Sequence, residues 1–222
     1  MGNRITDHKV HIFVGMFGSG KTEAAINFSI RMRNIFDKVS IADIDIISPY
    51  FRTRDKAEFL ENKDIKVILP PKIYLNADLP IISPAVGGYI SNPEYKIILD
   101  VGGNDDGIMV IGSLNNFLQN ADAAVYFVIN TMRPFTDSEE KISSHIDRLS
   151  QKARINVNYL ICNTNIIEQT SQGDLTLGEK MVMRVSQSKN IPVAFTMVNE
   201  DRKDLQTLNE RFEIKRFMKT EW

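Results

Sequence analysis

The sequence has little cysteine and almost no net charge, and each shortage excludes a class of protein. Its single cysteine, Cys162, excludes an internal disulfide framework and a metal site built from several cysteines of one chain. This usage is typical of a reducing compartment, so we expect a cytoplasmic location. The net charge of −1 gives no general attraction to nucleic acid or anionic lipid, and we expect no nucleic-acid partner.

Long apolar runs and clustered histidines are also missing. The longest hydrophobic stretches are too short to cross a bilayer, and the first ten residues contain no apolar segment of the signal-peptide type. His8, His11 and His145 are scattered without the spacing of metal ligands. The short apolar runs exclude a transmembrane helix. The scattered histidines argue against a histidine metal centre.

The 222 residues are enough for one α/β domain, which we expect to span residues 1–222. Apolar, β-branched runs of the kind that form buried parallel strands occur at 10–15, 39–45, 65–70, 95–101, 123–130, 157–163 and 192–198. Helical patterns lie between most of them, at 21–36, 52–61, 107–119, 136–153, 177–189 and 201–211. The alternation predicts a three-layer αβα fold with a doubly wound, mostly parallel sheet.

Two segments depart from this alternation. Residues 70–94 form a proline-rich elaborated loop, which could cover a sheet edge, act as a lid or present a partner surface. The C-terminal tail, 201–222, has an apolar stripe at helical spacing. We expect a helix that packs on the domain rather than one that binds a membrane.

The stretch "GMFGSGKT" at positions 15–22 fits G-x-x-x-x-G-K-[ST], the phosphate-binding P-loop motif, between an apolar run and a helical pattern. Its glycines let successive backbone N–H groups point at phosphate oxygens, and the following helix adds the positive end of its dipole. Lys21 would neutralise the β- and γ-phosphates, and Thr22 would ligate Mg²⁺. The expected nucleotide contacts from this stretch are Gly15, Gly18, Ser19, Gly20, Lys21, Thr22 and Glu23.

Carboxylates at predicted strand ends complete the motif. Asp100 ends the apolar run "YKIILD" and is expected to hold Mg²⁺, while Gly103 follows as a backbone N–H that senses the γ-phosphate. Asp43 and Asp45 point the same way from another strand, because residues i and i+2 share a face. We expect Asp45 to orient the attacking water and Asp43 to contribute to the Mg²⁺ shell; the alternative is that both cap the strand end.

Arg52 and Arg54 follow this pair in "PYFRTRD". They could stabilise the charge of a phosphoryl-transfer transition state, or be surface charges on the following helix. The sequence leaves both interpretations open.

Four stretches together, "GMFGSGKTEAAINFS", "IADIDIISPYFRTRD", "LDVGGNDDG" and "ICNTNIIEQT", resemble the SIMIBI class of P-loop NTPases. More narrowly, they are similar to bacterial ATP-binding proteins of the CobQ/CobB/MinD/ParA nucleotide-binding group, over residues 10–198. The resemblance implies a role for Asp45 in hydrolysis and for Asn163 in contacting the purine. It also implies ATP rather than GTP, because residues 163–166 read Asn-Thr-Asn-Ile, without the Lys and Asp of the GTPase motif.

One position departs from that group: Met16 stands where MinD- and ParA-like proteins carry a second lysine that reaches across a nucleotide-bound dimer. A homodimer therefore stays an open alternative. The expected function is slow, Mg²⁺-dependent ATP hydrolysis coupled to a protein partner. The alternatives are an ATP-dependent ligase or kinase of the dethiobiotin synthetase or cobyrinic acid amidase type, and a nucleotide switch that does not hydrolyse.

Overall fold

The computed structural model describes residues 3–44, 53–69, 83, 85–103 and 105–218. Its strands form one eight-stranded sheet in the order β3-β2-β4-β1-β5-β6-β7-β8, in which every neighbouring pair is parallel. The strands are β1 (Val10–Val14), β2 (Val39–Ile44), β3 (Ile65–Ile68), β4 (Lys96–Val101), β5 (Ala123–Ile129), β6 (Tyr159–Cys162), β7 (Val193–Asn199) and β8 (Arg211–Ile214). The predicted parallel α/β sheet is confirmed.

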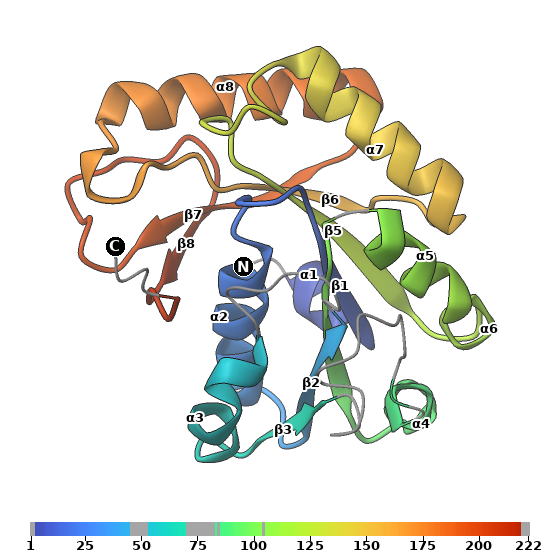
Figure 1. Cartoon of the computed structure of the whole chain (residues 1–222). Coiled ribbons are helices and arrows are strands. Elements are labelled where there is room, and N and C mark those ends of the chain that lie inside the picture. Colours follow the sequence, from blue (N-terminus) through green and yellow to red (C-terminus); the bar gives the residue numbers. More distant parts are fainter. Residues whose placement is uncertain (1–2, 45–52, 70–82, 84, 104, 219–222) are drawn as a thin grey trace.

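Helices cover both faces of the sheet (Figure 1). One face carries α1 (Asn3–Asp7), α2 (Lys21–Arg33) and α3 (Ala57–Glu61), the last entered through a short 3₁₀ turn at Thr53–Lys56. The other face carries α4 (Ala85–Ser91), α5 (Asp105–Ser113), α6 (Asn115–Leu118), α7 (Glu139–Ala153) and α8 (Gln172–Lys189). Strands with apolar side chains on both faces can be buried only in this arrangement, which is the predicted three-layer αβα architecture.

Local capping explains where the long helices begin. Ser138 accepts a hydrogen bond from the Lys141 N–H at the start of α7, and Ser171 and Asp174 form a reciprocal capping box at the start of α8. The capping box starts α8 at Gln172, five residues before the predicted helix. The structure also adds α4 inside the segment expected to be a loop, because Val86 and Ile90 are buried against the sheet. Residues 70–82 and 84 of that segment lie outside the described residues.

The predicted C-terminal helix is wrong over the described residues. Residues 201–210 form turns, and Arg211–Ile214 form β8, which pairs with β7 and extends the sheet. Phe212 and Ile214 are buried while Glu213 is exposed, a period of two that suits a strand. The apolar residues with the spacing of a helical stripe therefore do not lie on one element. Ile214 is in β8, whereas Phe217 lies beyond the strand and packs on Phe59.

The turn before β8 is held by a carboxylate inside the molecule. Glu179 of α8 is fully buried and accepts hydrogen bonds from the Thr196 hydroxyl (2.6 Å), the Leu208 N–H (3.0 Å) and the Asn209 N–H (3.1 Å). The Asn209 side-chain amide donates to it as well (3.0 Å). A buried carboxylate is tolerated only with partners of this kind, so Glu179 fixes the connection that delivers β8 to the sheet.

Replacing Glu179 with Ala should lower the free energy of unfolding by about 3 kcal/mol, because it leaves several buried donors without an acceptor. Urea denaturation measures the change. Lys180→Ala, at the adjacent exposed position of α8, should stay within about 0.5 kcal/mol of the parent. Equal effects of the two substitutions would contradict this role for Glu179.

Burial also controls a histidine at the opposite, amino-terminal edge of the sheet. His11 of β1 is fully buried, and its Nδ1 lies 3.0 Å from the Tyr126 hydroxyl, which donates to the Ile5 carbonyl (3.0 Å). Burial lowers the pKa of His11 from 6.5 to about 3, with smaller contributions from the positive charges of His8 and Lys96. Similarly, burial raises the pKa of the Cys162 thiol to about 11.

The unfolded chain protonates His11 below pH 6.5, whereas the folded chain does not do so until about pH 3. Stability contributed by the neutral imidazole is therefore lost as the pH falls through this window, by up to about 1.4 kcal/mol per pH unit. Urea denaturation of the parent and of His11→Phe between about pH 4 and 6 should show a shallower pH dependence in the variant. Equal slopes would show that His11 does not carry this linkage.

Candidate functional site

The P-loop lies at the carboxyl edge of the sheet, between β1 and α2. Gly18 (φ 74°) and Gly20 (φ 89°) adopt left-handed backbone conformations that side chains rarely accept. Gly20 is the N-cap of α2, so the loop delivers the backbone directly into the N-terminus of a helix, where free N–H groups and the dipole favour an anion. The predicted strand–loop–helix context is confirmed.

The P-loop backbone is packed against three neighbouring segments at distances that leave no room for a side chain. A β-carbon on Gly15 would lie 2.5 Å from the Val128 carbonyl oxygen of β5. One on Gly103, after β4, would lie 2.3 Å from the Gly15 carbonyl oxygen, and one on Gly20 would lie 2.1 Å from the Asn163 amide nitrogen. Ser19, Lys21 and Thr22 are all buried within this packing.

Gly103→Ala should destabilise the protein by about 1–3 kcal/mol, because its methyl group would displace the P-loop backbone. Gly112→Ala is the matched control: a β-carbon there meets no atom within 4 Å, and the position is helical. That control should be neutral or stabilising by up to about 1 kcal/mol. Urea denaturation of both variants tests the comparison, and similar behaviour of the two would contradict the close approach.

Two of the predicted carboxylates lie side by side. Asp43 of β2 and Asp100 of β4 are directly paired in the sheet and both are buried. Asp100 accepts a hydrogen bond from the Thr53 hydroxyl (2.7 Å), and Asp43 accepts from the Arg54 side-chain Nε (2.8 Å) and backbone N–H (3.2 Å). The 3₁₀ turn after β2 therefore brings an alcohol and a cation to the acidic pair.

The structure decides against one of the two interpretations of Arg54. The Arg54 side chain is 14% exposed and paired with a fully buried carboxylate, so it is not a solvated surface charge. Its position also means that Asp43 is engaged by a guanidinium, and its role as a Mg²⁺ ligand stays a prediction. Asp45 and Arg52 lie outside the described residues, so their predicted roles stay predictions too.

The available donors fit a nucleotide-held Mg²⁺ better than a cation caged by protein alone. Mg²⁺ at phosphate sites takes one or two protein oxygens and completes its shell with phosphate and water. Thr22, at the start of α2, and Asp100, at the end of β4, supply oxygens of this kind beside the P-loop. Within the part of the chain that the structure describes, no group of three or more His, Cys, Asp or Glu side chains is arranged to hold a metal ion.

Asn163 lies against the P-loop, with both polar ends of its side chain engaged. Its amide nitrogen donates to the Ser19 carbonyl (2.7 Å), and its amide oxygen accepts from Asn165 (2.9 Å). Asn165 is held in turn by Asn130, whose side chain bonds both its N–H (3.2 Å) and its carbonyl (3.0 Å). Asn163 thus supports the phosphate loop in this structure, and its contact with the purine stays a prediction.

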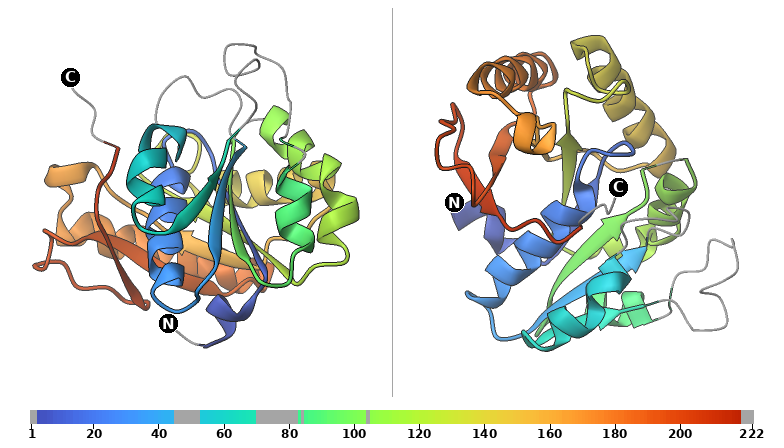
Figure 2. Two further views of the ribbon diagram at one scale, coloured as in Figure 1. Left: turned by 90° about the horizontal axis from the view of Figure 1, so that it is seen from below. Right: turned by 60° about the vertical axis from the view of Figure 1, so that its left-hand side comes forward.

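Glu23 faces the C-terminal segment. Its carboxylate accepts hydrogen bonds from the Phe217 N–H (3.0 Å) and the Met218 N–H (2.6 Å), and burial raises its pKa. One turn further along α2, Asn27 bonds the N–H (2.8 Å) and the carbonyl (2.9 Å) of Lys215. The C-terminal segment therefore runs along the first turns of α2 (Figure 2), and the nucleotide contact of Glu23 stays a prediction.

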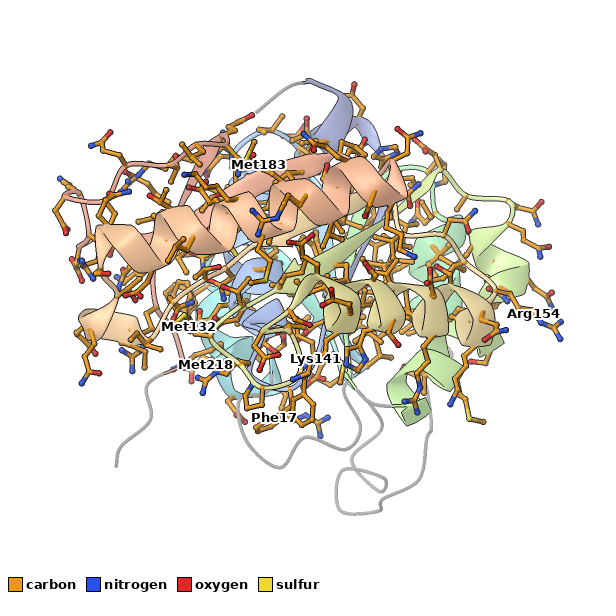
Figure 3. The ribbon with its side chains drawn as sticks, turned by 90° about the horizontal axis from the view of Figure 1, so that it is seen from above. Phe17, Met132, Lys141, Arg154, Met183 and Met218 are labelled. Atoms are coloured by element: carbon orange, nitrogen blue, oxygen red, sulfur yellow. The ribbon has the colours of Figure 1, made fainter. Side chains whose placement is uncertain are left out.

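The loop after β5 also contacts the P-loop, which no motif in the sequence indicates. Arg133 packs on the P-loop: its Nε and Cζ lie 3.2 Å and 3.7 Å from the position of a β-carbon on Gly18. Phe17 at the tip of the P-loop is 58% exposed, and Met132 beside Arg133 is 38% exposed. Both lie toward the same side of the molecule in Figure 3, away from Arg154. The signal in the sequence is an Arg-Pro pair after a predicted strand. It indicates a residue near the P-loop only once β5 is known to lie beside β1.

No protein-family model matches the chain, and no curated protein matches it. Solved structures do. FtsY from Mycoplasma mycoides has a TM-score of 0.59 at 18% identity, over 85% of this chain and 59% of that one. Chloroplast FtsY from Physcomitrella patens has 0.61 at 18%, over 91% and 62%. FlhF complexed with GTP/Mg²⁺ has 0.54 at 16%, over 85% and 65%.

These similarities show the fold. The chain has the P-loop NTPase fold of these structures, and it spans about three fifths of their length. They give no support to the narrower resemblance to the CobQ/MinD/ParA group. Among the described residues, no helix is long and apolar enough to cross a membrane.

Proposed function

We propose that the chain binds a nucleoside triphosphate together with Mg²⁺ at the P-loop and hydrolyses it slowly. The observation that carries the proposal is the geometry of residues 15–22. Gly18 and Gly20 adopt left-handed backbone conformations, the loop ends in the N-cap of α2, and it packs against β5 and the segments after β4 and β6. This concave run of backbone N–H groups suits a chain of phosphates.

The residues around the loop divide the chemistry between them. Lys21 neutralises the β- and γ-phosphates, and the N–H groups at the start of α2 bind phosphate oxygens. Thr22 and Asp100 would hold Mg²⁺, which withdraws charge from the phosphates during transfer. Thr53, by donating to Asp100, orients that carboxylate, and Gly103 places its backbone against the loop. Asp45 is assigned the orientation of the attacking water.

For the base of the nucleotide we propose adenine, so the ligand is ATP. Recognition of guanine needs an acidic side chain for its ring and amino N–H donors, and the segment after β6 offers Asn163, Thr164 and Asn165 instead. GTP is the second candidate, favoured by the similarity to FlhF, which was solved with GTP/Mg²⁺. The two nucleotides differ in their base edges and not in their phosphates, so the P-loop itself does not choose between them.

The proposal also includes a protein partner and a cytoplasmic location. A homodimer and a nucleotide switch that hydrolyses negligibly are the alternatives that stay open. The ligase or kinase alternative requires an acceptor pocket, which the 70–94 loop would have to form. Most of that loop lies outside the described residues, and no contact among the described residues favours this alternative.

Lys21→Ala should weaken Mg²⁺-nucleotide binding by at least about a hundredfold, because it removes the motif's only cation. Calorimetric titration with ATP and GTP, with phosphate release measured in parallel, tests the site and the base together. Asp100→Asn should lower turnover and weaken the dependence on Mg²⁺. Undiminished binding by Lys21→Ala would overturn the site assignment, and preferential binding of GTP would overturn the choice of ATP.

A further inference from the structure

The loop between β5 and α7 places a cation against the P-loop that the motif does not include. Arg133 is exposed to solvent, yet its side chain lies along Gly18: a β-carbon there would be 3.2 Å from Nε, 3.5 Å from Cδ and 3.7 Å from Cζ. Gly18 has no side chain to push the arginine away, so the guanidinium rests on the backbone of the phosphate loop.

The backbone on both sides of Arg133 is fixed by hydrogen bonds. The Arg133 N–H donates to the Asn130 carbonyl (3.1 Å), and the Thr136 hydroxyl donates to the same carbonyl (2.7 Å). The Thr136 N–H donates to the Arg133 carbonyl (2.9 Å), and Lys141 of α7 donates to the Pro134 carbonyl (2.9 Å). A loop anchored in this way holds its side chain near one place before any ligand arrives, which reduces the entropy lost on binding.

The charge of the guanidinium is available to a ligand. Among the described residues, no carboxylate is paired with Arg133, whereas Arg54, on the other side of the site, is committed to Asp43. Within positions 15–22 the only cation is Lys21. A magnesium-bound triphosphate stays negatively charged, and negative charge grows on the β–γ bridging oxygen as its bond to the γ-phosphorus breaks.

We propose that Arg133 is a catalytic residue of this site, supplied by the chain itself, whose guanidinium binds the terminal phosphate across Gly18. The inference rests on the proposed function. In the reaction, water attacks the γ-phosphorus, the bond to the β–γ bridging oxygen breaks, and the products are the nucleoside diphosphate and inorganic phosphate. Arg133 donates N–H hydrogen bonds to the oxygens that gain charge and keeps its own protons throughout.

The test compares nucleoside tri- and diphosphate in Arg133→Ala and Arg133→Lys, using the base that the parent binds more tightly. Arg133→Ala should lose about 10²–10³-fold in kcat and about tenfold in affinity for the triphosphate, with diphosphate affinity within about twofold of the parent. Arg133→Lys should recover most of the triphosphate affinity but little of the turnover, because an ammonium lacks the planar, forked donors. If turnover in the parent is too slow to measure, the affinities for triphosphate and diphosphate alone test the proposal.

Two controls distinguish a lost contact with the phosphate from a general effect of charge and from a loss of folding. Arg148→Ala removes the same charge from an exposed position of α7 and should leave both affinities unchanged. Unfolding midpoints without nucleotide should be equal for the parent and both Arg133 variants, because Arg133 is exposed. Unchanged triphosphate affinity and turnover in Arg133→Ala, or equal loss for tri- and diphosphate, would overturn this inference alone. A parent protein that binds neither nucleotide would overturn the proposed function, and this inference with it.

Discussion

The close approach of four backbone segments at the P-loop is the constraint on which the rest of the site depends. The end of β5, the segment after β4 and the segment after β6 each contact the loop where a glycine leaves room for them. The contacts at Gly15 and Gly103 are made with backbone carbonyls, so they cannot be relaxed by rotating a side chain. The Asn163 side chain at Gly20 is held in place by its own hydrogen bonds. Together these contacts fix the direction of the loop's N–H groups, which is the property that a phosphate site requires.

The acidic pair next to the loop depends on the same geometry. Asp43 and Asp100 come from neighbouring parallel strands whose register places them side by side, in a region almost inaccessible to water. Two adjacent buried carboxylates are costly unless positive charge or donors accompany them. The turn after β2 supplies both, through Arg54 and Thr53. The burial of this acidic pair therefore depends on the 3₁₀ turn as well as on the strand register.

The C-terminal part of the chain is tied to the site rather than appended to it. Glu179 fixes the turn that leads into β8, and Glu23 and Asn27 hold the residues that follow along the first turns of α2. Arg216 adds an ion pair to Glu168, in the segment after β6 (2.9 Å). The helix that carries Lys21 and Thr22 is thereby buttressed by the residues that follow β8, which helps to keep its N-terminus oriented.

The sequence by itself determined the parallel sheet and the strand–glycine turn–helix of the P-loop, because these follow from local patterns of apolar runs and glycines. From an acid at a strand end and the loop motif it also predicted Lys21, Thr22 and Asp100 as site residues. It failed at the C-terminus, where four residues of alternating burial were read as part of a helix, since a short run carries too little periodicity to separate the two. Only the tertiary structure decided that Arg54 pairs with Asp43, that Asn163 supports the loop, and that Arg133 lies on Gly18. Each of these contacts joins segments that are adjacent only because of the strand order, and strand order follows from how the helices and strands pack rather than from any local pattern.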